Sequence, residues 1–215
     1  MKLLSLSALL ALTLGAVAAD APAPATLPYQ ENFEAAEVGK LPKGFTSFAG
    51  AFKVQEEEGK KFLELPGAPL DTFGVLFGPS EKPPLTATAK FFGTSTKRKQ
   101  PAFALSLGGV GGFRLQVSAA KGALEIFKAD EPRASVPFAY ASGTWVSLRI
   151  QVRENAGKWV VEGKAWPADA AEPAAWTIQY DAPENPPQGK AGVWGNPFSG
   201  TPIRFDDLTV AVPAS

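Results

Sequence analysis

Apolar and polar residues alternate in short runs along most of the chain after residue 28. In the run 144–153, Val146, Leu148 and Ile150 fall on one side of an extended backbone, and Ser147 and Arg149 fall on the other. A period of two is typical of a β-strand with one buried face and one solvated face. No stretch of ten residues shows the period of an amphipathic helix. The pattern therefore predicts an all-β protein.

Gly, Pro, Asp and Asn separate these runs, and the chain contains 20 Pro and 21 Gly, which suits many tight turns. Regularly spaced turn signals favour two packed antiparallel sheets over β-α-β units. Because residues 102–108 and 112–119 alternate in the same way as 144–153, we expect the middle of the chain to form one sheet with a polar outer face. The predicted strands cover residues 28–34, 45–55, 61–67, 73–78, 85–92, 102–108, 112–119, 123–129, 135–140, 144–153, 158–166, 176–181, 190–195 and 202–212.

The first residues have the order of a secretory signal peptide. Lys2 precedes an apolar stretch that ends at Leu14, and Ala16-Val17-Ala18 then provides a small-x-small cleavage site. The apolar stretch is shorter than the roughly 20 residues of a membrane span, and no later stretch reaches that length. We predict a signal peptide over 1–19, an Ala/Pro linker over 20–27, one domain over 28–213, and export to the periplasm or the extracellular space. The alternative is a buried N-terminal helix.

The composition excludes several chemistries. The chain has no His and no Cys, which removes Ser-His-Asp hydrolysis, thiol nucleophiles, His- or Cys-ligated metals, disulfides and the lipid anchor of a bacterial lipoprotein. Its 21 basic and 21 acidic residues balance, so no overall field attracts nucleic acid. Catalysis would need carboxylates, Lys, Tyr or a hard metal ion.

Several stretches resemble the laminin G-like, concanavalin A-like jelly-roll domains of secreted bacterial proteins. They are ENFE, LPKGF, GTWVSLRIQV with the following KWVVEGKAW, KAWPADAAEPAAWTIQY with the following GKAGVWG, and the closing PIRFDDLTV. The resemblance covers nearly all of the chain after the signal. It implies a two-sheet antiparallel jelly-roll sandwich whose first and last strands are neighbours. Because this fold hosts lectins, glycosidases, lyases and adhesion modules, the resemblance implies little about function.

Carboxylates are candidates for catalysis and for metal binding. Hydrolases of this fold carry Glu-x-Asp-x-Glu on one strand, but Phe127 and Ala129 follow Glu125 at those positions. If the first and last strands pair, acidic residues from both ends meet at one rim, where oxygen ligands suit a structural calcium ion. The alternative is that these carboxylates are solvated or bind nearby backbone. The candidate calcium ligands are Glu31, Glu34, Asp206 and Asp207.

A carbohydrate platform is the third candidate, because sugars bind where an aromatic ring lies beside planar polar side chains. The small residues Ala102, Ala104 and Ser106 would leave room for a ligand next to such side chains. The alternative is an ordinary solvated face, with Trp166 packed under the Pro-rich connection that follows it. The predicted ligand-binding residues are Arg114, Gln116, Arg149, Gln151, Glu162, Lys164 and Trp166.

Three functions are compatible with the sequence. The first is an exported, non-catalytic module that binds carbohydrate or cell-surface glycan. The second is a structural or protein-interaction component of the cell envelope, and the third is a carboxylate-dependent enzyme acting on polysaccharide. We expect a monomer with no resident cofactor other than the possible calcium ion, and with a glycan or an envelope protein as its partner.

Overall fold

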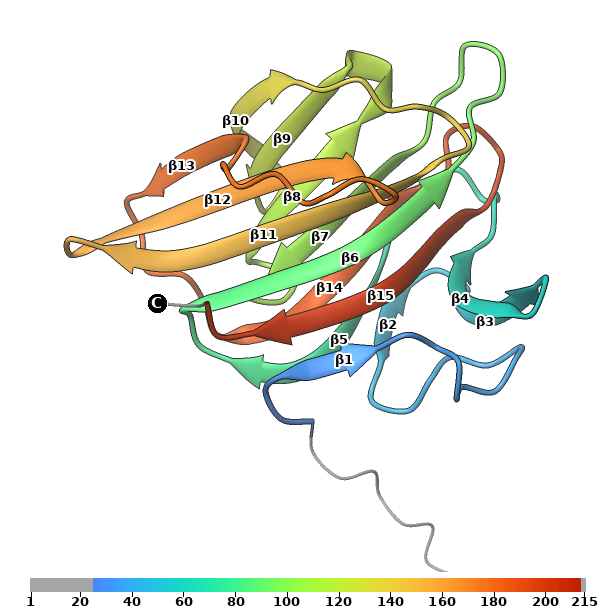
Figure 1. Cartoon of the computed structure of the whole chain (residues 1–215), viewed down its shortest axis with the longest axis horizontal. Helices are drawn as coiled ribbons and strands as arrows, with labels where there is room; N and C mark the ends of the chain where they lie inside the picture. Colours follow the sequence, from blue (N-terminus) through green and yellow to red (C-terminus); the bar gives the residue numbers. More distant parts are fainter. Residues whose placement is uncertain (1–24, 214–215) are drawn as a thin grey trace, which may run out of the picture.

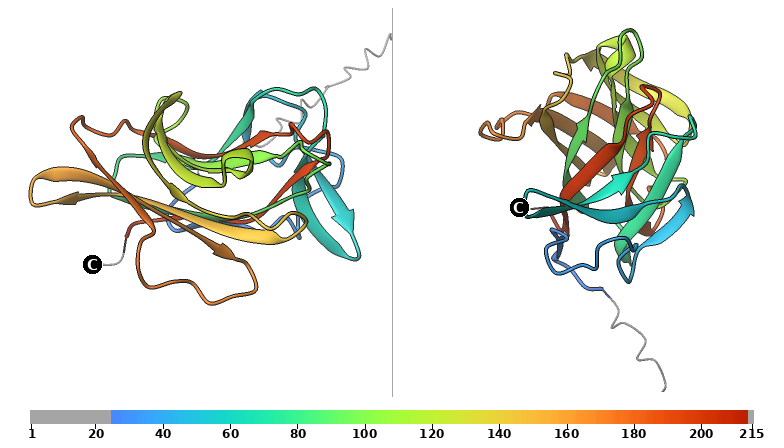
Figure 2. Two further views of the ribbon diagram at one scale, coloured as in Figure 1. Left: turned by 90° about the horizontal axis from the view of Figure 1, so that it is seen from above. Right: turned by 90° about the vertical axis from the view of Figure 1, so that its right-hand side faces the viewer.

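The computed structural model describes residues 25–213 and is all-β, with two antiparallel sheets stacked face to face (Figures 1 and 2). The predicted signal peptide, residues 1–19, lies outside the described residues. A short 3-10 turn, Ala119–Lys121, interrupts the strands. Within residues 25–213, no helix has the length and apolar character needed to cross a membrane. The predicted fold class, a two-sheet jelly-roll sandwich, is confirmed.

The first sheet, called sheet A, contains eight strands. Its order is β13 (Ile178–Ala182), β12 (Lys158–Pro167), β11 (Trp145–Asn155), β6 (Leu85–Gly93), β15 (Ile203–Ala211), β4 (Lys60–Leu65) and β3 (Lys53–Glu57). The remaining strand, β1 (Tyr29–Glu31), pairs antiparallel with β15. The first and last strands are therefore neighbours, as the resemblance implied.

The second sheet, sheet B, contains seven strands. Its order is β10 (Glu131–Pro137), β9 (Ala123–Lys128), β8 (Phe113–Ser118), β7 (Ala102–Leu107), β14 (Gly189–Asn196), β5 (Phe73–Glu81) and β2 (Thr46–Ala49). The strands β7 to β10 follow one another along the chain, whereas β14 enters between β5 and β7 from far away in sequence.

We expected the middle of the chain to form one sheet, and this expectation was wrong. Strands β7, β8 and β9 belong to sheet B, whereas β11 and β12 belong to sheet A. Their apolar faces meet across the core: a Cβ added at Gly163 of β12 would lie 2.4 Å from Cδ1 of Leu115 in β8. Alternation shows that a strand has a buried face, but two strands with the same pattern can pack side by side or face to face.

The strand expected over residues 45–55 is divided between the sheets. Its first part is β2 of sheet B and its second part is β3 of sheet A. Gly50 lies between them with φ of +95°, and a Cβ there would be 2.8 Å from Cβ of Phe73. Only glycine fits this conformation and this close approach, so the chain crosses from one sheet to the other at Gly50.

The core fills the space between the sheets and is rich in phenylalanine. Phe91 of sheet A stacks on Phe103 of sheet B, with ring centroids 5.2 Å apart. Phe205 meets Phe91 edge-on at 5.5 Å. All three side chains are fully buried. The sandwich is thus held by aromatic contacts between the layers, and this rigid core supports the two outer faces.

Candidate functional site

The predicted ligand-binding residues lie on opposite outer faces of the sandwich, because β8 and β11 belong to different sheets. Arg114 and Gln116 are on sheet B. The others are on the outer face of sheet A, namely Arg149, Gln151, Glu162, Lys164 and Trp166. These residues therefore cannot form a single binding surface.

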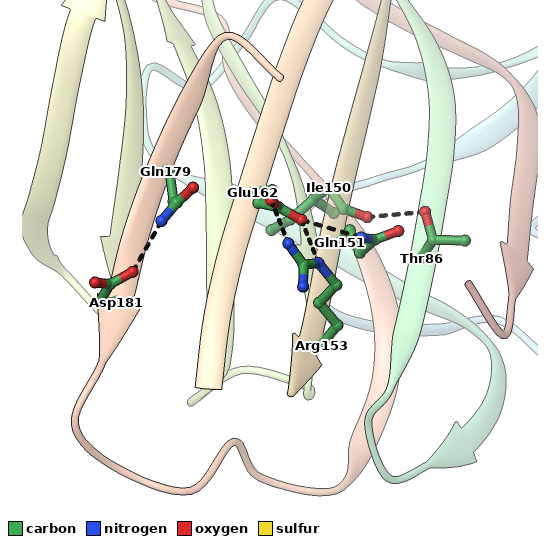
Figure 3. Close-up of polar contacts among 7 residues, drawn as sticks. All are labelled: Thr86, Ile150, Gln151, Arg153, Glu162, Gln179 and Asp181. Atoms are coloured by element: carbon green, nitrogen blue, oxygen red, sulfur yellow. Dashed lines mark hydrogen bonds and ion pairs between the residues drawn. The ribbon is translucent and has the colours of Figure 1, made fainter. Parts of the chain in front are cut away.

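On sheet A, Glu162 is the centre of a network within the chain (Figure 3). Arg153 donates two hydrogen bonds to its carboxylate, from Nε at 2.8 Å and from Nη2 at 2.9 Å. Gln151 donates a third from Nε2 at 3.0 Å. Glu162 is only 3% exposed, so its charge is compensated by side chains and is withdrawn from solvent.

The connection between β12 and β13 binds the rest of this face. Glu172 of that connection pairs with Arg149 at 2.8 Å and with Lys164 at 2.7 Å. Lys164 Nζ also donates to the carbonyl of Pro173 at 2.7 Å. Trp166 is 9% exposed and therefore offers little ring surface for stacking. The polar groups of this face are largely engaged by the chain itself.

On sheet B, Arg114 and Gln116 lie beside the small residues that were expected to leave room. The β7–β8 register places Ser106 opposite Arg114 and Ala104 opposite Gln116. A depression of about 530 Å³ opens here on the outer face. The lining residues are Thr72, Ala102, Arg114, Gln116, Asp130, Asn196 and Phe198. This half of the predicted set is thus brought together around a concave surface.

Arg114 lies between two aromatic rings. Its Cζ is 5.1 Å from the ring centroid of Phe127 and 5.2 Å from that of Trp194. Trp194 is fixed because its Nε1–H donates to Oγ of Ser106 at 2.8 Å. Burial lowers the pKa of the Arg114 guanidinium, and Asp130 opposes this shift. The ring contacts hold the guanidinium in one position, which is favourable for recognition of a ligand.

The neighbouring polar groups belong to short networks. Gln116 Nε2 donates to Oγ of Ser118 at 2.9 Å. Ser118 in turn donates to the buried Glu125, which also pairs with Lys121 at 3.1 Å. The side-chain amide of Asn196 donates to the hydroxyl of Thr72. The depression thus presents amide and hydroxyl groups, whereas the charge of Glu125 is already engaged by Lys121 and Ser118.

Two exposed aromatic side chains complete this face, and the sequence analysis did not find them. Phe198 lines the depression and is 46% exposed. Phe48 is also exposed and contacts Trp194, with ring centroids 4.7 Å apart. Phe198 lies in the turn after β14, in the sequence NPFSG. An aromatic residue in such a polar turn is the signal that could have identified it.

A second depression, of about 680 Å³, lies at the tip of the β11–β12 hairpin. The hairpin extends beyond the strands of sheet B (Figure 2, left), so Trp159 is only partly buried although it packs against the core. Its Nε1–H donates to Oδ1 of Asn185 at 3.0 Å. Glu154 and Asp181 also line this depression. In the register, Glu154 shares the core-side face with Trp159, whereas Asp181 lies opposite Val160 on the outer face.

Within residues 25–213, the four predicted calcium ligands are not grouped as a metal site. Strands β1 and β15 pair as the hypothesis required, but Glu31 accepts the backbone N–H of Phe33 at 2.6 Å and Asp207 pairs with Lys90 at 2.6 Å. In the part of the chain that the structure describes, no three acidic side chains are grouped to hold a metal. Glu34 lies close enough to act on the pKa of Asp206, and calcium can also bind backbone carbonyls and water, so the calcium site stays a prediction.

Burial raises the pKa of Asp206 from 3.8 to about 6. Between these values the native chain binds more protons than the unfolded chain, so stability decreases as pH rises through this range. We expect Asp206→Asn to remove this dependence and to raise the free energy of unfolding at pH 7 by about 1 kcal/mol, allowing for partial solvent screening. Urea unfolding at pH 4 and pH 7 measures this. Asp169→Asn, at an exposed position, is the control. If the pH dependence is unchanged in Asp206→Asn, then the raised pKa of Asp206 is not its cause.

Comparison with known proteins gives similarity in structure only. No family model matches the sequence, and no curated protein matches it. The carbohydrate-binding module CBM66 from Bacillus subtilis is similar, with a TM-score of 0.56 and 11% identity over 78% of this chain and 95% of that one. Lectin II from Ulex europaeus has a TM-score of 0.54 and 12% identity, covering 85% of this chain and 97% of the lectin.

A catalytic domain is among the similar structures as well. The glycoside hydrolase family 131 domain from Coprinopsis cinerea has a TM-score of 0.53 and 10% identity, covering 86% of this chain and 93% of that domain. Identities this low establish the fold and leave the activity open. The chain has the concanavalin A-like lectin/glucanase fold, a jelly roll shared by carbohydrate-binding modules, lectins and glycoside hydrolases.

Proposed function

We propose that this chain is an exported, non-catalytic carbohydrate-binding module, and that it holds a glycan in the depression on the outer face of sheet B. The observation that supports this is the meeting of the exposed ring of Phe198 with the planar polar groups of Arg114, Gln116 and Asn196 around one opening. A ring face packs on the C–H surface of a sugar, while amides and guanidinium groups bind its hydroxyls.

A binding role is favoured over hydrolysis at this depression because of its carboxylates. Hydrolysis of a glycosidic bond commonly uses two carboxyl groups on either side of the bond. Among the residues that line the depression, Asp130 is the single acidic one. Asp130 alone cannot supply both the general acid and the nucleophile or base that this reaction uses.

Glycan-array screening followed by titration calorimetry tests the proposal. We expect Phe198→Ala to weaken binding by about 10-fold or more, in line with the loss of one aromatic contact. Val212→Ala, which removes an exposed apolar side chain elsewhere, should leave binding unchanged. If binding is lost in Arg149→Ala and kept in Phe198→Ala, the ligand lies on sheet A. If no glycan binds and a stoichiometric protein partner co-purifies, the chain is an interaction component.

Hydrolysis is a second candidate function, because a glycoside hydrolase domain is among the similar structures. Glu154 and Asp181 are the acidic residues that line the depression at the β11–β12 hairpin, and hydrolysis of a sugar would require both to reach the same bond. The test is release of reducing ends from polysaccharides. Activity that is abolished in both Glu154→Gln and Asp181→Asn would establish an enzyme, and absence of turnover would remove this candidate.

A further inference from the structure

We propose that the depression on sheet B selects acidic glycans, and that Arg114 binds the carboxylate of a uronic acid residue. This inference rests on the proposed function, since it names the class of sugar that the same depression takes. Arg114 differs from the other arginines in ion pairs, because it is more buried and its counter-ion is farther away.

Among the arginines that form ion pairs in residues 25–213, Arg114 is the most buried and the most weakly paired. Its side chain is 12% exposed, and its Nη2 lies 3.7 Å from Oδ1 of Asp130, which is fully exposed. By contrast, Arg153 is 34% exposed and forms two short hydrogen bonds to Glu162. A cation withdrawn from water without a close counter-ion raises the free energy of the protein. An anionic ligand would recover that free energy.

The part of Arg114 that can meet an anion is the end of the guanidinium beside Asp130. Phe127 and Trp194 lie beside the guanidinium carbon, which is 5.1 and 5.2 Å from their ring centroids. In the described chain, Nε of Arg114 is buried and has no hydrogen-bond partner, whereas Nη2 faces the fully exposed Asp130 and the side chain lines the depression. The donors of a guanidinium lie in its plane and match the two oxygens of a carboxylate.

Asp130 shows where the carboxylate of a ligand would lie. It lines the same depression and is the nearest carboxylate that pairs with Arg114, yet its full exposure makes the contact weak. A uronate carboxylate that binds Arg114 would displace Asp130. The hydroxyls of the same sugar would meet the amides of Gln116 and Asn196. Arg114 and Asp130 therefore have opposite expected effects on binding.

The experiment uses purified full-length protein and pairs of polysaccharides. Each pair consists of an acidic polymer (polygalacturonate, alginate or a glucuronan) and the same polymer after reduction of its carboxyl groups to alcohols. We expect binding to at least one acidic member, with affinity at least 10-fold lower for its reduced form. Binding should also weaken as salt increases, because an ion pair that is open to solvent is screened.

Two variants test the role of the charge. Arg114→Gln should lower affinity for the acidic polymer by about 10-fold or more, whereas Asp130→Asn should raise it by roughly 2- to 5-fold, since it removes the competing carboxylate. Asp130 is fully exposed, so its variant tests the proposal even if Arg114→Gln folds poorly. Glu131→Gln, at the neighbouring exposed residue, is the matched charge control for Asp130→Asn.

The outcomes separate this inference from the proposed function. Binding to neutral glycans alone, or equal binding to the acidic and reduced polymers, would overturn the inference and leave carbohydrate binding standing. Full binding by Arg114→Gln, or no gain in Asp130→Asn, would overturn the assignment to Arg114. Absence of binding to every glycan, acidic or neutral, would overturn the proposed function itself.

Discussion

Phe91→Ala is expected to lower the free energy of unfolding by about 3–5 kcal/mol, the usual cost of removing a fully buried phenylalanine. Phe91 contacts Phe103 of the opposite sheet and Phe205 of its own sheet, so the cavity would open at the centre of the sandwich. Neither neighbour can fill this space without leaving its own contacts. Urea unfolding followed by tryptophan fluorescence measures the change.

The adjacent residue provides a matched control. Phe92 lies on the same strand but on the outer face of sheet A, where it is partly exposed and contacts Trp145. Phe92→Ala should cost about 1 kcal/mol, since less apolar surface leaves a buried position. Equal losses of stability for the two variants would mean that Phe91 does not lie between the sheets.

Glu162→Ala is expected to lower the free energy of unfolding by about 2–3 kcal/mol. The change leaves Arg153 and Gln151 without the acceptor they share, and removing one partner of a buried ion pair is costly. The loss should be at the lower end of the range for buried pairs, because Arg153 is 34% exposed and can turn to water. Chemical unfolding of the variant measures the loss.

This second variant distinguishes a structural role for the sheet A network from a ligand-binding role. Glu154→Ala, at an exposed position of the same hairpin, is the control and should change stability by less than about 0.5 kcal/mol. If Glu162→Ala is as stable as the original chain and loses glycan binding, then the network on sheet A is a binding surface, and our assignment of the depression on sheet B is wrong.

The sequence indicated which strand positions are polar, but it did not indicate which of these positions share a face of the molecule. Arg114 and Gln116 were identified with the small residues beside them, because alternation places both on a polar face. The prediction that they share a face with Arg149 and Gln151 was wrong, because sheet membership depends on which apolar faces pack together. Phe198 was missed because its exposure follows from the path of the turn after β14, and no periodic pattern describes that turn.

The partners of charged side chains also could not be predicted from the sequence. The charged and polar residues of β11 and β12 suggested a surface open to ligands, but the Pro-rich connection folds back and engages Arg149 and Lys164 through Glu172. Pairing of β1 with β15, by contrast, was predicted from the resemblance and is confirmed. The acidic residues at that rim nevertheless contact backbone and Lys90, because side-chain partners are set by neighbours that are distant in sequence.

The sequence by itself determined that this chain is all-β, that its strands have one apolar face, and that histidine and cysteine chemistry is absent. Those properties follow from local periodicity and composition, which need no knowledge of contacts between distant residues. Only the tertiary structure decided which strands share a sheet and which polar groups lack partners within the chain. That decision came from the packing of the two apolar faces, which left Arg114 beside an open depression and surrounded Glu162 with donors.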